Sequence, residues 1–177
     1  MTQDEVFQMA LGIATSVCPG YEEDPNTIAL MATGIAKKES GYSESAKNKH
    51  STARGLMQML ICTQREVEKK RAKVDFADAM YSCNVYPTDT VDQSDDLIFD
   101  PNYALLLAIH EICYQMNRYG DDQQKAIHAY NQGSFPGVHK SDGTLYARSV
   151  INNIYNIKLS SNTDMAAATG APRKEFY

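Results

Sequence analysis

The carboxyl group of Glu39 stands where a catalytic acid could lie. It follows an apolar helical stretch, residues 28–36, and precedes a polar loop, so it could form the wall of a cleft. Burial beside apolar side chains raises the pKa of a carboxyl group and keeps it protonated near neutral pH. Such a group can protonate a poor leaving oxygen and then remove a proton elsewhere as the conjugate base. The alternative is a solvated glutamate at a helix end, where its charge would oppose the helix dipole.

Side chains that could hold a ligand beside Glu39 lie nearby in the sequence and in the next polar segment. In Gly55-Leu56-Met57-Gln58 the glycine would let the backbone approach a ligand closely, and the amide of Gln58 offers both a donor and an acceptor. Met57 either contacts the ligand or packs in the core. Ser40 could hydrogen-bond a ligand or the carboxyl group of Glu39, or it could bond the helix backbone locally.

Tyr130, Asn131 and Tyr146 complete the candidate site from the C-terminal half of the chain. Tyr130 and Asn131 end one helical segment, and Tyr146 lies on the inner side of the next. A buried tyrosine needs a partner for its hydroxyl group, so each tyrosine could equally be an ordinary core residue. We therefore interpret these three as candidate ligand-binding side chains, with a structural role as the alternative.

Helices must position these residues, and the apolar spacing predicts a mainly helical domain. Asp24 with Pro25, and Asp100 with Pro101, are residue types that cap a helix and begin its first turn. A short extended or β segment is expected near residues 51–60. The predicted helices span residues 6–17, 24–40, 63–81, 103–116, 121–131 and 145–157.

Charge and composition exclude several kinds of partner. A net charge of −5 gives no overall field that would attract nucleic acid. The apolar stretches are too short for a membrane span, and the acidic start Met-Thr-Gln-Asp-Glu predicts no conventional signal peptide. The histidines are scattered without metal-ligand spacing, so we expect no metal and no cofactor. We interpret the cysteines mainly as core thiols, with two disulfides as the alternative: Cys18, Cys62, Cys83 and Cys113.

Taken in order and spacing, the segments Glu39-Ser40-Gly41-Tyr42, Gly55 to Gln58, Ala126 to Gly133 and Tyr146 resemble the soluble lytic transglycosylase domain of the goose-type lysozyme superfamily. The resemblance covers roughly residues 24 to 158. It implies a mainly α, lysozyme-like (α+β) fold and cleavage of peptidoglycan glycan strands between N-acetylmuramic acid and N-acetylglucosamine, without a cofactor. The resemblance implies one catalytic acid and a set of binding residues: Glu39 as the acid, with Ser40, Met57, Gln58, Tyr130, Asn131 and Tyr146 against the saccharide.

The chain departs from the family pattern at several positions. Ile61 or Cys62 stands where a proline is usual, Ala104 and Ala108 replace an asparagine and a glycine, and His128 replaces an alanine. The stretch between Thr63 and Asp100 is also longer than the family core. We therefore expect a domain over residues 1–160 with an inserted lobe at about 64–98, followed by a flexible tail over 161–177.

Two other functions remain compatible with the sequence. A lysozyme-type hydrolase would need a second carboxylate to position water, and Glu44 is the nearest candidate in the sequence. A structural component of a virion or secretion apparatus could keep the fold and make little use of its activity. Because a wall-degrading enzyme must reach the wall, we expect delivery by a phage particle, a holin-type pore or a secretion apparatus, whose proteins would then be partners.

Overall fold

The structure, a computed structural model, describes residues 1–72, 97–133 and 140–169, with the backbone alone for Ala72, Lys140 and 158–169. Within these residues, β structure is limited to two isolated bridges, which confirms the mainly helical prediction and reduces the expected β part to a minimum. The elements in chain order are α1 (Gln3–Val17), η1 (Cys18–Gly20), α2 (Pro25–Ser40), α3 (Ile61–Val67), the π-helical turn η2 (Glu68–Ala72), α4 (Pro101–Arg118), α5 (Gln123–Gln132) and α6 (Lys140–Thr169).

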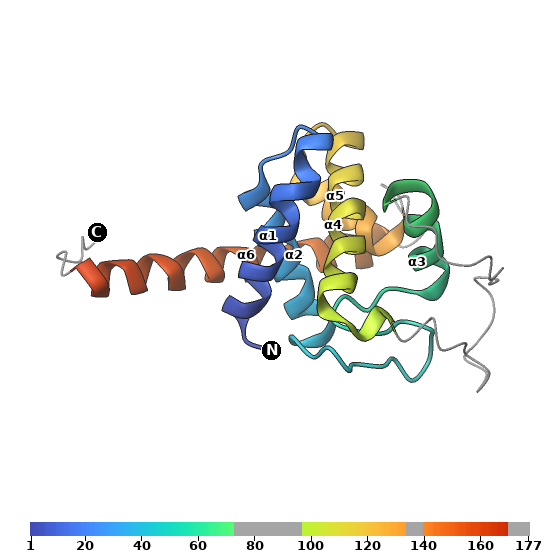
Figure 1. Ribbon diagram of the computed structural model, residues 1–177, viewed down its shortest axis with the longest axis horizontal. Coiled ribbons are helices and arrows are strands. Elements are labelled where there is room, and N and C mark those ends of the chain that lie inside the picture. Colours follow the sequence, from blue (N-terminus) through green and yellow to red (C-terminus); the bar gives the residue numbers. More distant parts are fainter. Residues whose placement is uncertain (73–96, 134–139, 170–177) are drawn as a thin grey trace.

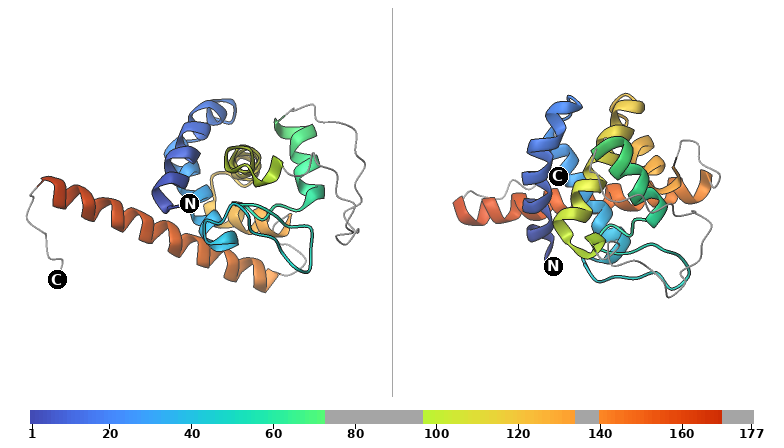
Figure 2. Two further views of the ribbon diagram at one scale, coloured as in Figure 1. Left: turned by 60° about the horizontal axis from the view of Figure 1, so that its bottom comes forward. Right: turned by 45° about the vertical axis from the view of Figure 1, so that its right-hand side comes forward.

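Helix α4 lies at the centre of the domain. It packs against α1, α2, α3 and α5, and α6 runs across the other side of α2 and α5 (Figure 1). Figure 2 shows α4 nearly end-on, with the other helices arranged around it. Its apolar side chains explain this position, since ten of its residues are buried, among them Leu105, Leu107 and Ile109. Helix α4 therefore carries much of the core.

Local capping fixes the start of two long helices as the sequence predicts. The Asp24 carboxylate accepts hydrogen bonds from the backbone N–H groups of Asn26 and Thr27, and Pro25 begins α2. Asp100 caps α4 in the same way, ahead of Pro101. Each such cap satisfies backbone N–H groups that the first turn of a helix leaves unpaired. The caps thus set the register that places Glu39 on the last turn of α2.

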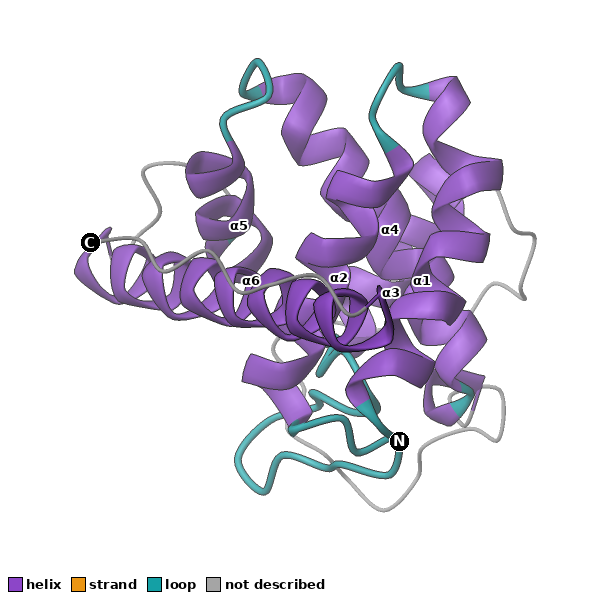
Figure 3. Ribbon diagram, turned by 90° about the vertical axis from the view of Figure 1, so that its left-hand side faces the viewer, coloured by secondary structure: helices purple, strands orange, loops and turns teal. Residues whose placement is uncertain are grey.

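The loop over residues 41–60 connects α2 to α3 at one end of the helices (Figure 3). Arg54 forms bridges with Lys47 and with Met59, so the loop folds back on itself. Gly55 has a φ of 72°, and a Cβ atom there would overlap the carbonyl oxygen of Ile98. We expected the missing side chain of Gly55 to allow a ligand to approach closely. In the structure it allows the backbone of Ile98, just before α4, to approach instead. Gly55 therefore fixes the loop against the core.

The ends of several elements differ from the sequence prediction. Helix α6 begins at Lys140 and continues to Thr169, whereas the apolar pattern predicted only 145–157. The described part of the predicted helix 63–81 divides into α3 and η2. Most of the expected inserted lobe, residues 73–96, lies outside the described residues. The domain boundary at residue 160 and the flexibility of 161–177 stay predictions.

The buried residues include two cysteines and several residues at which the chain departs from the family pattern, His128 among them. Cys18 and Cys113 are free thiols in the core, with their sulfur atoms 3.6 Å apart, and Cys62 is a half-buried free thiol. Burial raises the pKa of the thiols of Cys18 and Cys113. His128 is fully buried, and its ring packs so closely on α6 that a Cβ at Gly143 would lie 2.5 Å from it. His128 is therefore part of the contact between α5 and α6. Cys83 lies outside the described residues.

No helix within the described ranges combines the length and apolar character needed to cross a bilayer. The same residues contain no group of three or more histidine, cysteine or acidic side chains that could hold a metal ion.

Candidate active site

A cleft of about 550 Å³ lies between the end of α2, the loop before α3, and helices α4 and α5. Its size is that of a typical small-ligand site. Most of the predicted site residues line this cleft directly: Glu39, Met57, Gln58, Tyr130 and Asn131. The fold thus brings together side chains that are up to 92 residues apart in the chain, counted from Glu39 to Asn131.

Glu39 is held at the cleft wall by Tyr146 of α6. The hydroxyl group of Tyr146 donates a hydrogen bond of 2.5 Å to Glu39 Oε1. Burial raises the pKa of the Glu39 carboxyl group, and this hydrogen bond opposes the rise only in part. Gly41, in the left-handed conformation, ends α2 directly after this turn. Glu39 is therefore not the solvated glutamate of the alternative interpretation, because its side chain is half-buried and accepts a hydrogen bond from a buried tyrosine.

Tyr130 faces the same region with its hydroxyl group unused. The hydroxyl oxygen is buried and has no hydrogen-bond partner among the described residues. Burial raises the pKa of Tyr130 well above its ordinary value, and the negative charges of Glu39 and Glu111 add to the rise. Because Tyr130 lines the cleft, this unpaired hydroxyl is a candidate partner for a ligand. Tyr130 is therefore not a core tyrosine whose hydroxyl group is hydrogen-bonded by the described residues, which was the alternative interpretation.

Gln58 and Met57 both line the cleft but also serve the loop. The amide nitrogen of Gln58 donates to the backbone oxygens of Ala46, at 3.1 Å, and Gly55, at 3.0 Å. Its two hydrogens are thereby used, so Oε1 is the atom left to accept a bond from a ligand. Met57 is almost fully buried and packs in the core as well as on the cleft wall. Gln58 and Met57 therefore both have a structural role and lie where they can contact a ligand.

Ser40 lies outside the cleft, whereas Asn131 lines it. The hydroxyl group of Ser40 donates to the backbone oxygen of Ala36, at 3.1 Å, and Ser40 does not line the cleft. This geometry favours the local backbone role that the sequence left open. Asn131 is exposed at the end of α5, where its Oδ1 accepts a hydrogen bond of 2.5 Å from Gln132. Its side-chain nitrogen can still reach a ligand at the rim.

The cleft also contains a second group of residues that the sequence motifs did not predict. Glu66, Arg71, Glu111 and Gln115 all line the cleft, on the side formed by α3, η2 and α4. The run from Glu66 to Arg71 is typical of a solvated face, yet the side chain of Arg71 is only 13% exposed. A signal for the other two was present, because Glu111 and Gln115 are four residues apart in an otherwise apolar helix. Glu44, the sequence candidate for a second carboxylate, is exposed and does not line the cleft.

A single domain of helices around this cleft, with a half-buried glutamate at the end of α2, is a lysozyme-like fold. The chain belongs to the family of transglycosylase SLT domains, whose model matches residues 20–144. The structure is similar to that of an inactive mutant of lytic transglycosylase Slt from Pseudomonas aeruginosa, with a TM-score of 0.58 and 16% identity over 84% of this chain and 24% of that one.

The fold is also similar to that of the 70 kDa soluble lytic transglycosylase from Escherichia coli. The TM-score is 0.52 with 18% identity, over 81% of this chain and 20% of that one. This chain thus spans about a fifth to a quarter of the length of either protein. A comparison with curated proteins found no match.

Proposed function

We propose that this protein is a lytic transglycosylase that cleaves the β-1,4 bond between N-acetylmuramic acid and N-acetylglucosamine in peptidoglycan. The observation that carries the proposal is the half-buried carboxyl group of Glu39, which lines the cleft, has a raised pKa and is held by Tyr146. Membership of the transglycosylase SLT domain family supports the same chemistry. The exposed Asn131 and the buried hydroxyl of Tyr130 would contact the glycan strand.

In the first step Glu39 acts as an acid. Tyr146 donates a hydrogen bond to Oε1, so the transferable proton of the carboxyl group lies on the other oxygen. That proton passes to the glycosidic oxygen as the bond from this oxygen to the muramyl C1 breaks, which releases the next sugar as an alcohol. The raised pKa keeps a larger fraction of Glu39 protonated for this step. The substrate's own acetamido oxygen stabilises the positive charge that develops at C1.

In the second step the Glu39 carboxylate acts as a base. It removes the proton from the muramyl C6 hydroxyl group, whose oxygen then forms a bond to C1. The product is 1,6-anhydro-N-acetylmuramic acid, and Glu39 regains its proton. The sequence of steps uses one carboxyl group and no water.

Glu39→Gln tests this assignment. The amide keeps the shape of the side chain but cannot donate the proton, so we expect cleavage of purified peptidoglycan to fall by about 10²- to 10⁴-fold. Glu44→Gln is the matched control, because Glu44 is an exposed glutamate five residues away that does not line the cleft. It should cleave at the wild-type rate. A folded Glu39→Gln variant with full activity would show that another residue is the acid.

A muramidase on the same fold is the second candidate function. Its second carboxylate would be Glu111, which lines the cleft, and not Glu44, which does not. Glu111 is, however, bonded to Gln115 and lies against Arg71, which suits a fixed binding group better than a mobile base. Mass spectrometry of digests separates the two reactions. We expect muramyl ends lighter by one water, whereas mainly reducing ends would identify a hydrolase. A folded protein that cleaves no type of peptidoglycan would favour a structural virion component.

We also propose that the enzyme acts at the bacterial cell wall and reaches it on a phage particle, through a holin-type pore or by a secretion apparatus. The proposal follows from the site of the substrate, which lies outside the cytoplasm. Expression of this chain in a bacterial cytoplasm should then cause lysis only when a holin is co-expressed. Lysis by the chain alone would contradict this route.

A further inference from the structure

We propose that Arg71, Glu111 and Gln115 form a second binding subsite of the cleft, which takes a neutral sugar residue through its hydroxyl and acetamido groups. The inference rests on the proposed function, because the ligand is a residue of the same glycan strand. All three side chains line the cleft that contains Glu39. They come from η2 and α4, not from the segments that hold Glu39 and Tyr130.

The three side chains are fixed in place before any ligand binds. Gln115 donates a hydrogen bond of 2.6 Å to Glu111 Oε1, one turn away on α4. Arg71 Nη1 lies 2.9 Å from Glu111 Oε2, and the Arg71 guanidinium lies over the ring of Tyr114, 4.1 Å from its centre. A π-helical turn, a feature frequent at functional sites, carries Arg71 to this position. Such a preorganised group loses little conformational entropy on binding.

Two polar atoms of this cluster are buried and unused. Arg71 Nε and Gln115 Oε1 have no hydrogen-bond partner among the described residues, whereas Glu111 Oε2 is held by its ion pair with Arg71. Gln115 is only 1% exposed and Glu111 only 6%. Unpaired buried polar groups are unfavourable and uncommon in native proteins, so an unused donor and an unused acceptor on residues of a cleft wall favour a ligand that pairs with them.

The charges of the cleft favour a neutral ligand. The positive charge of Arg71 is balanced by Glu111, and the remaining acidic side chains on the wall are Glu39 and Glu66. The carboxylate groups of a peptide stem would meet these negative charges without a free cation of the described cleft wall to pair with. Sugar hydroxyl groups and an acetamido group carry no charge and supply both donors and acceptors.

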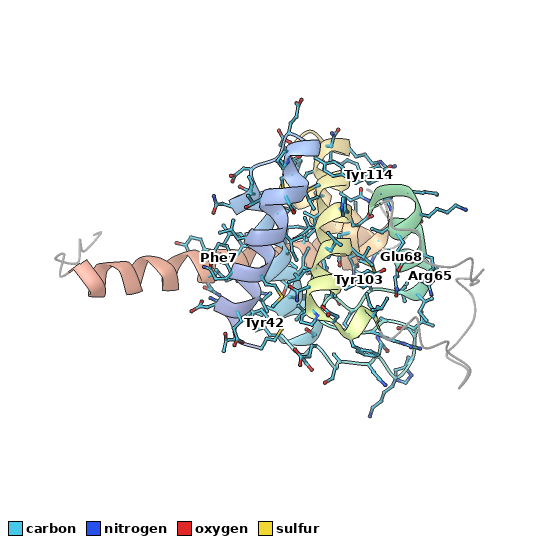
Figure 4. The ribbon with its side chains drawn as sticks, viewed as in Figure 1. Phe7, Tyr42, Arg65, Glu68, Tyr103 and Tyr114 are labelled. Atoms are coloured by element: carbon cyan, nitrogen blue, oxygen red, sulfur yellow. The ribbon has the colours of Figure 1, made fainter. Side chains whose placement is uncertain are left out.

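The molecule contains a matched cluster outside the cleft. Gln64 donates a hydrogen bond of 2.9 Å to the buried Glu68, one turn away, and Arg65 pairs with Glu68 at 3.0 Å. Tyr103 also bonds Glu68, and the positions of Arg65, Glu68 and Tyr103 are labelled in Figure 4. None of these residues lines the cleft. This second Gln-Glu-Arg cluster joins α3 and η2 to α4. Gln64 Oε1 is also buried without a hydrogen-bond partner among the described residues, so the position at the cleft wall is what distinguishes Arg71, Glu111 and Gln115 from this structural cluster.

The test compares Gln115→Met with Gln64→Met. Each substitution keeps the side-chain length, removes one buried amide and takes one donor from a buried glutamate, so the structural losses are matched. With glycan strands as substrate, we expect Gln115→Met to raise KM by about three- to tenfold, the effect of one or two hydrogen bonds, with little change in kcat. Gln64→Met should leave KM unchanged. Equal KM values for the two folded variants would overturn the proposal.

Glycan strands with and without their peptide stems identify the ligand of the subsite. If a sugar occupies it, the rise in KM for Gln115→Met is the same on both substrates. A rise seen only on strands that carry peptides would overturn the sugar assignment. A wild-type protein that neither cleaves nor binds glycan would overturn the proposed function and this inference together. Normal wild-type cleavage with equal variants overturns the inference alone.

A measurement on the Glu39→Gln protein covers the case in which Gln115→Met does not fold. Titration with the tetramer of N-acetylglucosamine should shift the side-chain amide resonances of Gln115 in an NMR spectrum and leave those of Gln64 in place. Shifts of the Tyr130 resonances without any shift at Gln115 would show that the glycan binds beside Glu39 but does not reach this subsite.

Discussion

The acidity of Glu39 results mainly from two opposed interactions, to which the charge of Lys38 adds a smaller lowering of the pKa. Burial disfavours the charged carboxylate and raises its pKa, whereas the hydrogen bond from Tyr146 favours the carboxylate and lowers it. Burial has the larger effect. The hydrogen bond from Tyr146 therefore acts on Glu39 in two ways. It fixes the orientation of the carboxyl group, and it limits how far the pKa of this group rises. An acid that must also act as a base benefits from this limit, because the carboxylate has to be accessible in the second step.

Tyr146→Phe should separate these consequences in a pH profile. The first step needs protonated Glu39, so kcat/KM falls as pH rises through the pKa of this group. Removal of the hydroxyl group takes away the interaction that lowers the pKa, and the alkaline limb should move to higher pH. Tyr103→Phe is the control, since Tyr103 bonds Glu68 outside the cleft. An alkaline limb that stays in place in Tyr146→Phe would show that this hydrogen bond does not set the acidity.

The sequence predicted the residues around Glu39 better than those around Glu111. Tyr130 and Asn131 were found through ordered short motifs, and the cleft contains them. Glu111 lies in a helix whose apolar residues dominated its interpretation, and Arg71 lies in a charged run that indicates solvent. Whether a polar side chain points inward depends on the phase of the helix and on which helix packs beside it, and η2 changes that phase just before Arg71.

At the scale of elements, local chemistry determined where α2 and α4 begin but not where α6 begins or ends. Asp24 and Asp100 cap α2 and α4 as predicted, because a cap depends on neighbouring residues only. Helix α6 starts earlier than its apolar pattern, and it passes so close to α2 that a Cβ at Gly34 would lie 2.8 Å from Ile154. Such a contact between residues 120 positions apart depends on tertiary packing, which no local pattern contains.

Gly55→Ala should destabilise the domain more than an ordinary glycine substitution. The left-handed backbone alone costs about 1–2 kcal/mol for a residue with a Cβ atom, and the overlap with the Ile98 carbonyl adds to this. We expect a loss of more than 2 kcal/mol, on the order of other strained core changes, in urea unfolding, with reduced cleavage because the loop carries Gln58. Gly120→Ala is the control, because Gly120 is also left-handed but has no atom within 4 Å of its Cβ position. Equal losses would show that the contact with Ile98 is not tight in solution.

At the scale of the whole molecule, the core and the projecting part of α6 are distinct. The described buried residues of α6 end at Ile157, which follows Ala147, Val150 and Ile154 on the inner face. Beyond this point the helix backbone continues to Thr169 and extends away from the other helices (Figures 1 and 2). Isolated helices of about a dozen residues are marginal in water, so the packed first half of α6 supports the second. The family match ends at residue 144, well before this extension.

A chain that ends at residue 160 should keep the fold and the activity. It retains every described buried residue, including Ile157, and the contacts of α6 with α2 and α5. We expect the Tm to change by no more than about 2–4 °C, which corresponds to roughly 1 kcal/mol for a domain of this size. A second truncation, at residue 149, provides the control: it removes Val150, Ile154 and Ile157 from the core and should abolish cooperative unfolding. Loss of cleavage in the longer truncated chain, with its Tm unchanged, would instead show that the projecting helix takes part in holding the substrate or a partner protein, and that the functional unit extends beyond the helices around the cleft.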